Sequence, residues 1–329
     1  MILNSKRVCR VVLTVSALAV LTTSLGSQKT RPTCDNDRQP ETILLTLLDT
    51  LGEFPQDLKE EDLLLKVNGN PIPVRGVELQ IGLPLDLSLL IDTSVSQEEV
   101  LPFTKLAARS AIETLLTAKD RVALLSFSDE IGVEEPLTTD LSKIAAALDR
   151  VKLTAPPGYA GGGVILGGSA IPGGAPPNKR GPGSTSLWDT VMVAMERTYN
   201  SPHDQNRRRA MILLTDGHDT SSETKSSAAI ASALQRNVVV YSIGVAGRNF
   251  TLNRDPLKRL SERTGGTTAF PKKAEDLKSV LLQIGKRIRS QYVISFCRVS
   301  TVPGPLKIEL DLTSPRFRNA RLAFQREVN

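Results

Sequence analysis

Five oxygen-bearing side chains stand in three separated segments where a hard metal ion could bind them. They are Asp92, Ser94, Ser96, Thr185 and Asp216. Magnesium prefers octahedral oxygen coordination at about 2.1 Å and keeps some of its water ligands, so a few carboxylates and hydroxyls suffice. We therefore expect one Mg²⁺ ion to bind here, provided that the fold brings the three segments together.

Each of these segments adjoins a predicted strand or helix. Asp92 follows the apolar run 85–91, Asp216 follows the apolar run 210–214, and Thr185 directly precedes a helical pattern. Open α/β sheets place their ligands at the carboxyl ends of the strands. The sequence therefore predicts that all five side chains meet at one edge of one sheet.

Strand-like and helix-like patterns alternate from residue 83 to residue 288. This alternation is typical of a doubly wound, mainly parallel α/β sheet. The strand runs are 85–91, 122–127, 210–214 and 238–245. The helical patterns are a segment with Ala108, Ile112, Leu115 and Leu116 on one face, then 141–151, 187–199, 222–235, 256–263 and 274–288.

Both flanks of this domain show β patterns. Segment 41–82 contains strand-like runs, and Asn68-Gly69 predicts a hairpin whose return strand runs from 72 to 79. Segment 289–329 contains three further strand-like runs. Neither flank is long enough to bury a core alone, so we expect 41–82 and 289–329 to pair as one small β domain.

Two other segments have distinctive compositions. Residues 1–27 combine a basic start with an apolar stretch and a small-residue cleavage site, which predicts a signal peptide and export to the periplasm or the cell exterior. The alternative is an uncleaved membrane anchor, but the apolar stretch is shorter than the roughly 20 residues that span a bilayer and contains hydroxyls, which favours cleavage. After removal of the signal peptide no membrane span is expected, and 28–40 is predicted to be a linker. Residues 156–183 form a Gly/Pro-rich insertion that ends just before Thr185 and is expected to lie over or beside the metal.

The cysteines fit an exported protein. Cys9 would leave with the signal peptide, and Cys34 and Cys297 would remain. Export permits disulfides, so these two can form a bridge between the start of the mature chain and its C-terminal strands, although two cysteines do not by themselves prescribe a pair.

Composition argues against nucleic acid as a partner. Aromatic residues make up 4% of the chain, too few for a platform of stacked bases. The formal net charge is +6, and the one basic cluster is Arg207-Arg208-Arg209. A charge run of this kind before a strand is expected to be a solvated turn.

The same motifs also have simpler interpretations. Segments 96–99, 186–189 and 220–223 each match a helix capping box. His203 and His218 have no spaced partner, which argues against zinc, and His218 is interpreted as a bystander rather than a general base. It is the joint occurrence of all five positions, each on the expected kind of element, that favours a metal site.

Three segments carry a family resemblance: Leu89-Leu90-Ile91-Asp92-Thr93-Ser94-Val95-Ser96, Gly183-Ser184-Thr185-Ser186-Leu187-Trp188-Asp189 and Ile212-Leu213-Leu214-Thr215-Asp216-Gly217. They resemble the motifs of von Willebrand factor A (VWA) domains. The flanking β segments resemble exported bacterial proteins of the "VWFA-related acidobacterial domain" family. The insertion 156–183 departs from VWA domains, in which this region is usually short.

The resemblance implies a VWA, Rossmann-like fold with a metal-ion-dependent adhesion site (MIDAS). The five residues would hold Mg²⁺ or Mn²⁺, and an Asp or Glu of a protein partner would bind the ion. On this basis we expect an adhesion-type binding module with no catalytic residues, whose selectivity is shaped by the insertion and by the turn 219–222.

Two alternatives remain. In one, the protein is a scaffold component of an envelope complex and the metal only orders loops. In the other it is an enzyme whose metal polarises a phosphoryl or carbonyl group, which would need a base or nucleophile that the sequence does not offer convincingly.

Overall fold

The computed structural model describes residues 34, 40–48, 55–162, 164–165, 184–202, 204, 207–298, 306–324 and 327–328. The predicted signal peptide 1–27, most of the linker 28–40, most of the insertion 156–183 and His203 lie outside the described residues.

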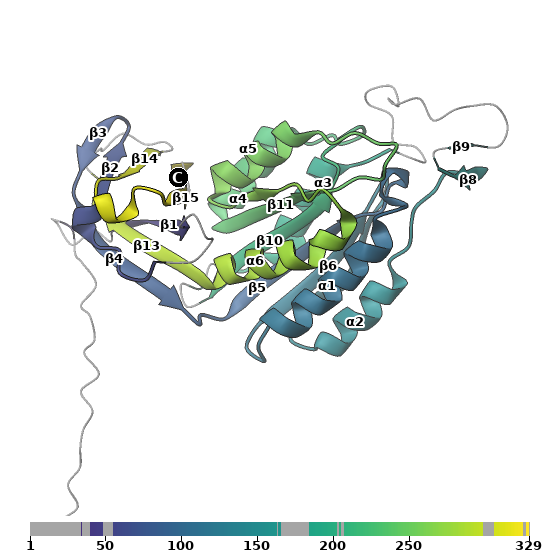
Figure 1. Cartoon of the computed structure of the whole chain (residues 1–329), viewed down its shortest axis with the longest axis horizontal. Coiled ribbons are helices and arrows are strands. Elements are labelled where there is room, and N and C mark those ends of the chain that lie inside the picture. Colours follow the sequence, from purple (N-terminus) through teal and green to yellow (C-terminus); the bar gives the residue numbers. More distant parts are fainter. Residues whose placement is uncertain are drawn as a thin grey trace, which may run out of the picture. The chain divides into compact units, whose positions relative to one another are not determined.

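A six-stranded sheet forms the centre of the α/β domain, in the order β12-β11-β10-β5-β6-β7 (Figure 1). All neighbouring strands are parallel except β6 and β7. The strands are β5 (Leu85–Asp92), β6 (Arg121–Phe127), β7 (Ile131–Thr138), β10 (Arg208–Thr215), β11 (Val238–Gly244) and β12 (Thr268–Ala269). The doubly wound, mainly parallel α/β fold predicted from the sequence is therefore confirmed.

Helices cover both faces of this sheet. The α-helices are α1 (Leu101–Leu115), α2 (Leu141–Arg150), α3 (Leu187–Thr198), α4 (Ser226–Gln235), α5 (Arg254–Thr264) and α6 (Leu277–Arg289). Helices α1, α2 and α6 pack on one face and α3, α4 and α5 on the other. Because both faces are covered, every residue of β5, β10 and β11 is buried, which explains their nearly continuous apolar sequences.

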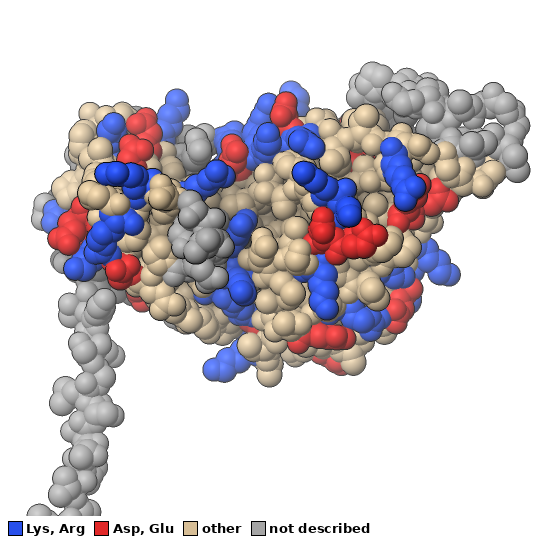
Figure 2. Space-filling view, in the orientation of Figure 1, with Lys and Arg blue, Asp and Glu red and all other residues tan. Residues whose placement is uncertain are grey.

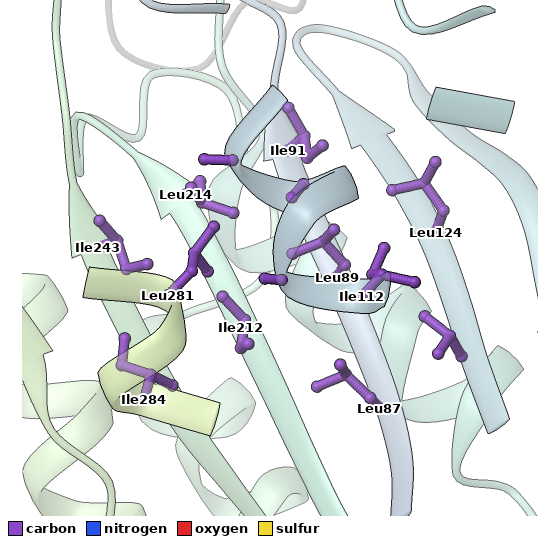
Figure 3. Close-up of a cluster of buried hydrophobic side chains, with 14 of the residues drawn as sticks. Leu87, Leu89, Ile91, Ile112, Leu124, Ile212, Leu214, Ile243, Leu281 and Ile284 are labelled. Atoms are coloured by element: carbon purple, nitrogen blue, oxygen red, sulfur yellow. The ribbon is translucent and has the colours of Figure 1, made fainter. Parts of the chain in front are cut away.

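Alternate residues of β5 divide between the two cores. Leu85, Leu87, Leu89 and Ile91 face α1 and α6, whereas Leu90 faces α3. Figure 3 shows the first of these cores, where Leu89, Ile212 and Leu281 meet from β5, β10 and α6. This packing holds β5 and β10 side by side, and the candidate site lies at their carboxyl ends.

Strand β7 was not predicted from the sequence. It is an antiparallel edge strand that pairs with β6 through two irregularities, and it contains Pro136. Its exposure does not alternate from residue to residue, so it lacks the period of two that identifies a half-buried strand. An edge position tolerates proline because one side of the strand needs no hydrogen-bond partner.

The two flanks form two four-stranded sheets, in the orders β15-β1-β13-β4 and β16-β14-β2-β3. The strands are β1 (Glu41–Leu48), β2 (Leu63–Val67), β3 (Asn70–Ile72), β4 (Val74–Ile81), β13 (Ser290–Phe296), β14 (Leu306–Leu312), β15 (Arg321–Phe324) and β16 (Glu327–Val328). N-terminal and C-terminal strands alternate in the first sheet, and in the second the C-terminal pair β16-β14 adjoins the N-terminal pair β2-β3; both sheets share one apolar core. Short elements complete the described chain: β8 (Tyr159–Gly161), β9 (Val164–Ile165), η1 (Glu60–Asp62), η2 (Val95–Gln97), η3 (Ala274–Asp276) and η4 (Pro315–Phe317).

The predicted return strand 72–79 is wrong in its extent. The hairpin turn does form, with Asn68 and Gly69 both at positive φ, but its second strand β3 ends at Ile72. Pro73 follows and has no backbone N–H to continue the ladder. The chain then enters β4, which pairs with β13 in the other sheet.

Cys34 and Cys297 form a disulfide across a sequence separation of 263 residues. Cys297 directly follows β13, so the bridge ties the segment before β1 to the strand that β1 pairs with.

Among the residues that the structure describes, no helix is both long and apolar enough to cross a bilayer.

The interpretation of Arg207–Arg209 as a solvated turn is wrong. Arg208 and Arg209 are only 5% exposed, and they begin β10. Arg207 donates two hydrogen bonds to the buried Asp86 carboxylate, and Arg208 donates to the carbonyls of Gln80 and Ile288. These partners offset part of the cost of removing the guanidinium groups from water, and among the described residues the Arg208 Nε has no hydrogen-bond partner.

Candidate metal site

The loop after β5 holds three of the predicted ligands in a continuous hydrogen-bond chain. Asp92 Oδ1 accepts from the Ser94 backbone N–H at 2.9 Å and from the Ser94 hydroxyl at 2.6 Å. The Ser94 and Ser96 hydroxyls are 3.1 Å apart. All three residues are buried, with 6% exposure or less. Because the ligands occupy every second position of this loop, their oxygen atoms lie together on one side of it.

Asp216 closes the same chain from the neighbouring strand. Its carboxylate is hydrogen-bonded by the Ser96 side chain and accepts the His218 backbone N–H at 2.9 Å. The preceding residue, Thr215, donates its hydroxyl to Asp92 Oδ2 at 2.6 Å. Because β5 and β10 are adjacent and parallel, residues 123 positions apart in sequence share one network.

The two carboxylates lie in surroundings that oppose their charge. Burial raises the pKa of Asp92 to about 7, with a further contribution from repulsion by Asp216. Burial also raises the pKa of Asp216. Among the described residues neither acid forms an ion pair within 4.0 Å. A bound cation would stabilise the charged form of two neighbouring buried acids that have no basic partner.

Thr185 is buried at 5% exposure and is anchored through its backbone. Its N–H donates to the Thr220 hydroxyl at 2.8 Å, and its carbonyl accepts the N–H groups of Thr220 and Ser221. The loop after β10 therefore carries Asp216 and also holds the segment of Thr185. The structure brings all five predicted residues to the carboxyl edge of the sheet, with Thr185 joined to the others through this loop.

The N-terminus of α3 is capped by that same loop. The Ser186 side chain does not cap the helix and contacts the Ser221 hydroxyl instead. Asp219 Oδ1 accepts the Leu187 N–H at 3.0 Å, and the Ser222 hydroxyl accepts the N–H groups of Trp188 and Asp189. The helix following Thr185 is thus capped by residues more than 30 positions away.

The three capping-box interpretations are consequently wrong. Ser96 bonds to Ser94 and to the Gln97 side chain, and the short η2 helix there has no side-chain cap. Segments 186–189 and 220–223 cap across to each other, since Asp189 in turn accepts the N–H groups of Glu223 and Thr224. The predicted helix 222–235 accordingly begins only at Ser226. The sequence signal for this mutual capping was that both boxes follow closely on predicted ligands, Thr185 and Asp216, which were expected to meet at one sheet edge.

Loop 92–99 is braced on two sides. On one side Glu98 accepts the Tyr159 hydroxyl at 2.7 Å and the Gly162 N–H at 2.8 Å, which attaches the described start of the insertion. On the other side the Gly247 N–H donates to the Ser96 carbonyl at 2.8 Å. Glu98 was not singled out in the sequence as a contact of the insertion.

One ring nitrogen of His218 contacts Thr251. Its Nε2 lies 3.1 Å from the Thr251 carbonyl oxygen and 3.3 Å from the Thr251 hydroxyl, so this nitrogen is turned toward Thr251. Within the described part of the chain, no group of three or more His, Cys, Asp or Glu side chains is arranged to hold a metal. The candidate donor set is therefore two carboxylates with neutral hydroxyls, which suits a hard cation such as Mg²⁺.

Gly217 is required directly after the Asp216 ligand. Its φ is +84°, and a Cβ atom there would lie 2.2 Å from the Asn253 carbonyl oxygen. We expect Gly217→Ala to destabilise the fold and to displace Asp216, which lowers metal affinity. Gly82→Ala is the matched control, since Gly82 has φ +76° and open space around it. It should show only the conformational cost, about 1–2 kcal/mol in chemical denaturation, and metal titration should be unchanged. Equal effects of the two variants would contradict this.

Comparisons with known proteins agree with this architecture. A family model described as von Willebrand factor type A domain matches residues 177–283, and a second model of the same description matches residues 85–154. The chain is therefore a VWA domain protein. A sequence comparison with curated proteins finds no match.

Solved structures with similar folds include three from different sources. Proximal thread matrix protein 1 from the mussel byssus is 14% identical with a TM-score of 0.47, and the match covers 64% of this chain and 48% of that one. The chain thus spans about half of the mussel protein. A VWA protein from Catenulispora acidiphila is 14% identical with a TM-score of 0.48, covering 89% and 74%. BatB from Bacteroides thetaiotaomicron is 17% identical with a TM-score of 0.44, covering 63% and 98%. One mussel structure is described with a zinc-occupied MIDAS motif.

Proposed function

We propose that this protein is a metal-dependent binding module that recognises a carboxylate of a protein partner. The observation that carries the proposal is the pair of buried acids, Asp92 and Asp216, which lie beside serine hydroxyls with no basic partner among the described residues. Asp92, Ser94, Ser96, Thr185 and Asp216 would hold Mg²⁺ or Mn²⁺.

The donor set suits a carboxylate partner. Serine and threonine hydroxyls carry no charge, so three of the five ligands would not neutralise the ion. A divalent ion with few charged ligands attracts a further anionic oxygen, and an Asp or Glu of a partner supplies one. When bound, the metal would act as the electrophilic centre that holds this carboxylate.

The binding role is favoured over the scaffold role by the way the loops are held. Hydrogen bonds between protein groups already join the loops that carry Ser96, Thr185 and Asp216. This leaves little ordering for a metal to supply. The enzyme alternative has less support, because His218 Nε2 is engaged by the carbonyl and hydroxyl groups of Thr251.

A nucleic-acid partner is not expected. Basic and acidic side chains are interspersed on the face shown in Figure 2, and the basic cluster Arg207–Arg209 is engaged by carboxylate and carbonyl groups.

Export to the periplasm or cell exterior is part of the proposal, and the disulfide between Cys34 and Cys297 supports it, since such bridges persist in oxidising compartments.

The proposal is tested with N-acetyl-glutamate amide and its uncharged counterpart N-acetyl-glutamine amide. We expect the glutamate probe to bind in Mg²⁺, with a dissociation constant on the order of 1 mM because so small a probe makes few contacts, and not in EDTA. The glutamine probe should not bind in either. Binding can be followed by chemical-shift changes. Metal binding without discrimination between the probes would favour the scaffold role instead.

A further inference from the structure

Asp219 lies outside the five-residue donor set but is bonded to the segment that carries one of its members. Its Oδ1 accepts the Leu187 N–H at 3.0 Å, two residues after Thr185. The same oxygen accepts the Ser222 hydroxyl at 2.5 Å. One carboxylate oxygen therefore joins the start of α3 to the loop that follows β10.

Ser222 extends this connection into the first turn of the helix. Its hydroxyl oxygen accepts the Trp188 N–H at 2.9 Å and the Asp189 N–H at 3.1 Å. Together Asp219 and Ser222 satisfy the first three backbone donors of α3. An α-helix leaves these donors without intrahelical partners, so their capping decides where and in which direction the helix begins.

Thr185 lies immediately before this capped turn, and its own backbone is bonded to Thr220 and Ser221. Both backbone groups of Thr185 are thus engaged by neighbours of Asp219, which leaves the side chain as the group that can face a metal. Shifting the start of α3 would shift this side chain relative to Asp216. The capping contacts therefore control the geometry between two loops of the candidate site.

We propose that Asp219 is a positioning residue that holds Thr185 in its metal-binding orientation by capping α3 from the loop of Asp216. The inference rests on the proposed metal-binding function and identifies a determinant of metal affinity outside the ligand set. Hydrogen-bond partners of ligand-bearing groups typically contribute a factor of about 10 to 100 to metal affinity.

The experiment compares Mn²⁺ titrations of the purified protein and three variants by calorimetry. Asp219→Ala removes both hydrogen bonds and should weaken binding by about 10- to 100-fold. Asp219→Asn keeps an oxygen acceptor and should bind within about threefold of the parent, since it loses only a charge that is not in the donor set. Ser222→Ala removes the second cap and should also weaken binding.

Asp140→Ala is the matched control for the loss of a helix cap. Asp140 caps α2 by accepting the Ser142 N–H at 3.0 Å and the Lys143 N–H at 3.4 Å, and it is exposed and outside the metal loops. Its replacement should lower thermal stability without changing Mn²⁺ affinity. A drop in affinity for Asp219→Ala but not for Asp140→Ala separates positioning from a general loss of stability.

Other outcomes overturn the inference. Unchanged affinity in Asp219→Ala, or in Ser222→Ala where the first variant does not fold, would show that the cap does not position Thr185. Equal weakening by Asp219→Asn and Asp219→Ala would assign the effect to charge. If the parent itself bound no Mn²⁺, the proposed function would fail together with this inference, whereas failure of the inference alone leaves the parent binding intact.

Discussion

Replacing Asp216 by alanine is expected to abolish metal binding. Asp216 supplies one of only two carboxylates in the donor set, and its loss should weaken Mg²⁺ binding at least as much as loss of an indirect partner does, by about 100-fold or more. The parent should gain about 2.7 kcal/mol in unfolding free energy at a Mg²⁺ concentration of 100 times its dissociation constant. The variant should gain at most about 0.4 kcal/mol at that concentration, as measured by calorimetry and thermal unfolding.

The same variant should behave differently without metal. Burial raises the pKa of Asp216, so its carboxylate is a cost to the metal-free fold near neutral pH. In EDTA the variant should therefore unfold at a temperature equal to or above that of the parent. Asp129→Ala, an acid in the loop after β6 that is outside the donor set, should retain the metal-dependent shift. Retention of the shift by Asp216→Ala would exclude this residue as a ligand.

Replacing Asp120 by alanine is expected to give the largest loss of stability. This carboxylate is fully buried and accepts hydrogen bonds from the backbone of Leu85 and Thr117 and from Arg289 at 2.5 Å and 3.1 Å. Its removal leaves the partly buried Arg289 guanidinium and two backbone donors without their buried acceptor, which should cost about 3–5 kcal/mol. Chemical denaturation measures the loss.

Asp149→Ala provides the control. Asp149 pairs with Arg109 at 2.6 Å, but its side chain is 70% exposed, so its loss should cost less than about 1 kcal/mol. Similar losses for the two variants would mean that burial does not set the strength of these ion pairs.

The Asp120 contribution should also depend on pH. Burial alone would raise its pKa, but the hydrogen bonds from Arg289 and Thr117 outweigh this and lower the pKa below its ordinary value. A carboxylate with a lowered pKa stabilises the fold above its unfolded pKa, near 4, and the stabilisation is lost as pH falls through the folded value. The difference in unfolding free energy between parent and Asp120→Asn should therefore shrink below about pH 4.

The consequences of removing Asp120 extend to the connection with the β strands. Its partner Arg289 ends α6, directly before β13, and also donates to the carbonyls of Leu83 and Leu115. Arg208 donates to Gln80 and Ile288, which adjoin the two places where the chain passes between the β strands and the α/β domain. Arg208 and Arg289 thus fasten both crossings.

The central fold could be predicted from sequence because each strand and helix carries its own periodic signal. Strands covered on both faces must be apolar throughout, and β5, β10 and β11 were found for that reason. The predicted ligands follow such strands or precede such a helix, so the parallel topology alone brings them to one edge. Local sequence was sufficient here because the pattern and the topology agree.

Only the tertiary structure decided where the polar groups find partners. The arginines at 207–209 look like a solvated run because a buried charge is costly, yet Asp86 and backbone carbonyls accept hydrogen bonds from all three, and of their buried nitrogens the Arg208 Nε finds no partner among the described residues. Segments 186–189 and 220–223 each look like a local capping box, yet each caps the other. A hydrogen-bonding side chain pairs with the nearest suitable partner in space, and for Arg207, Arg208 and the two capping segments that partner lies more than 30 positions away in the sequence.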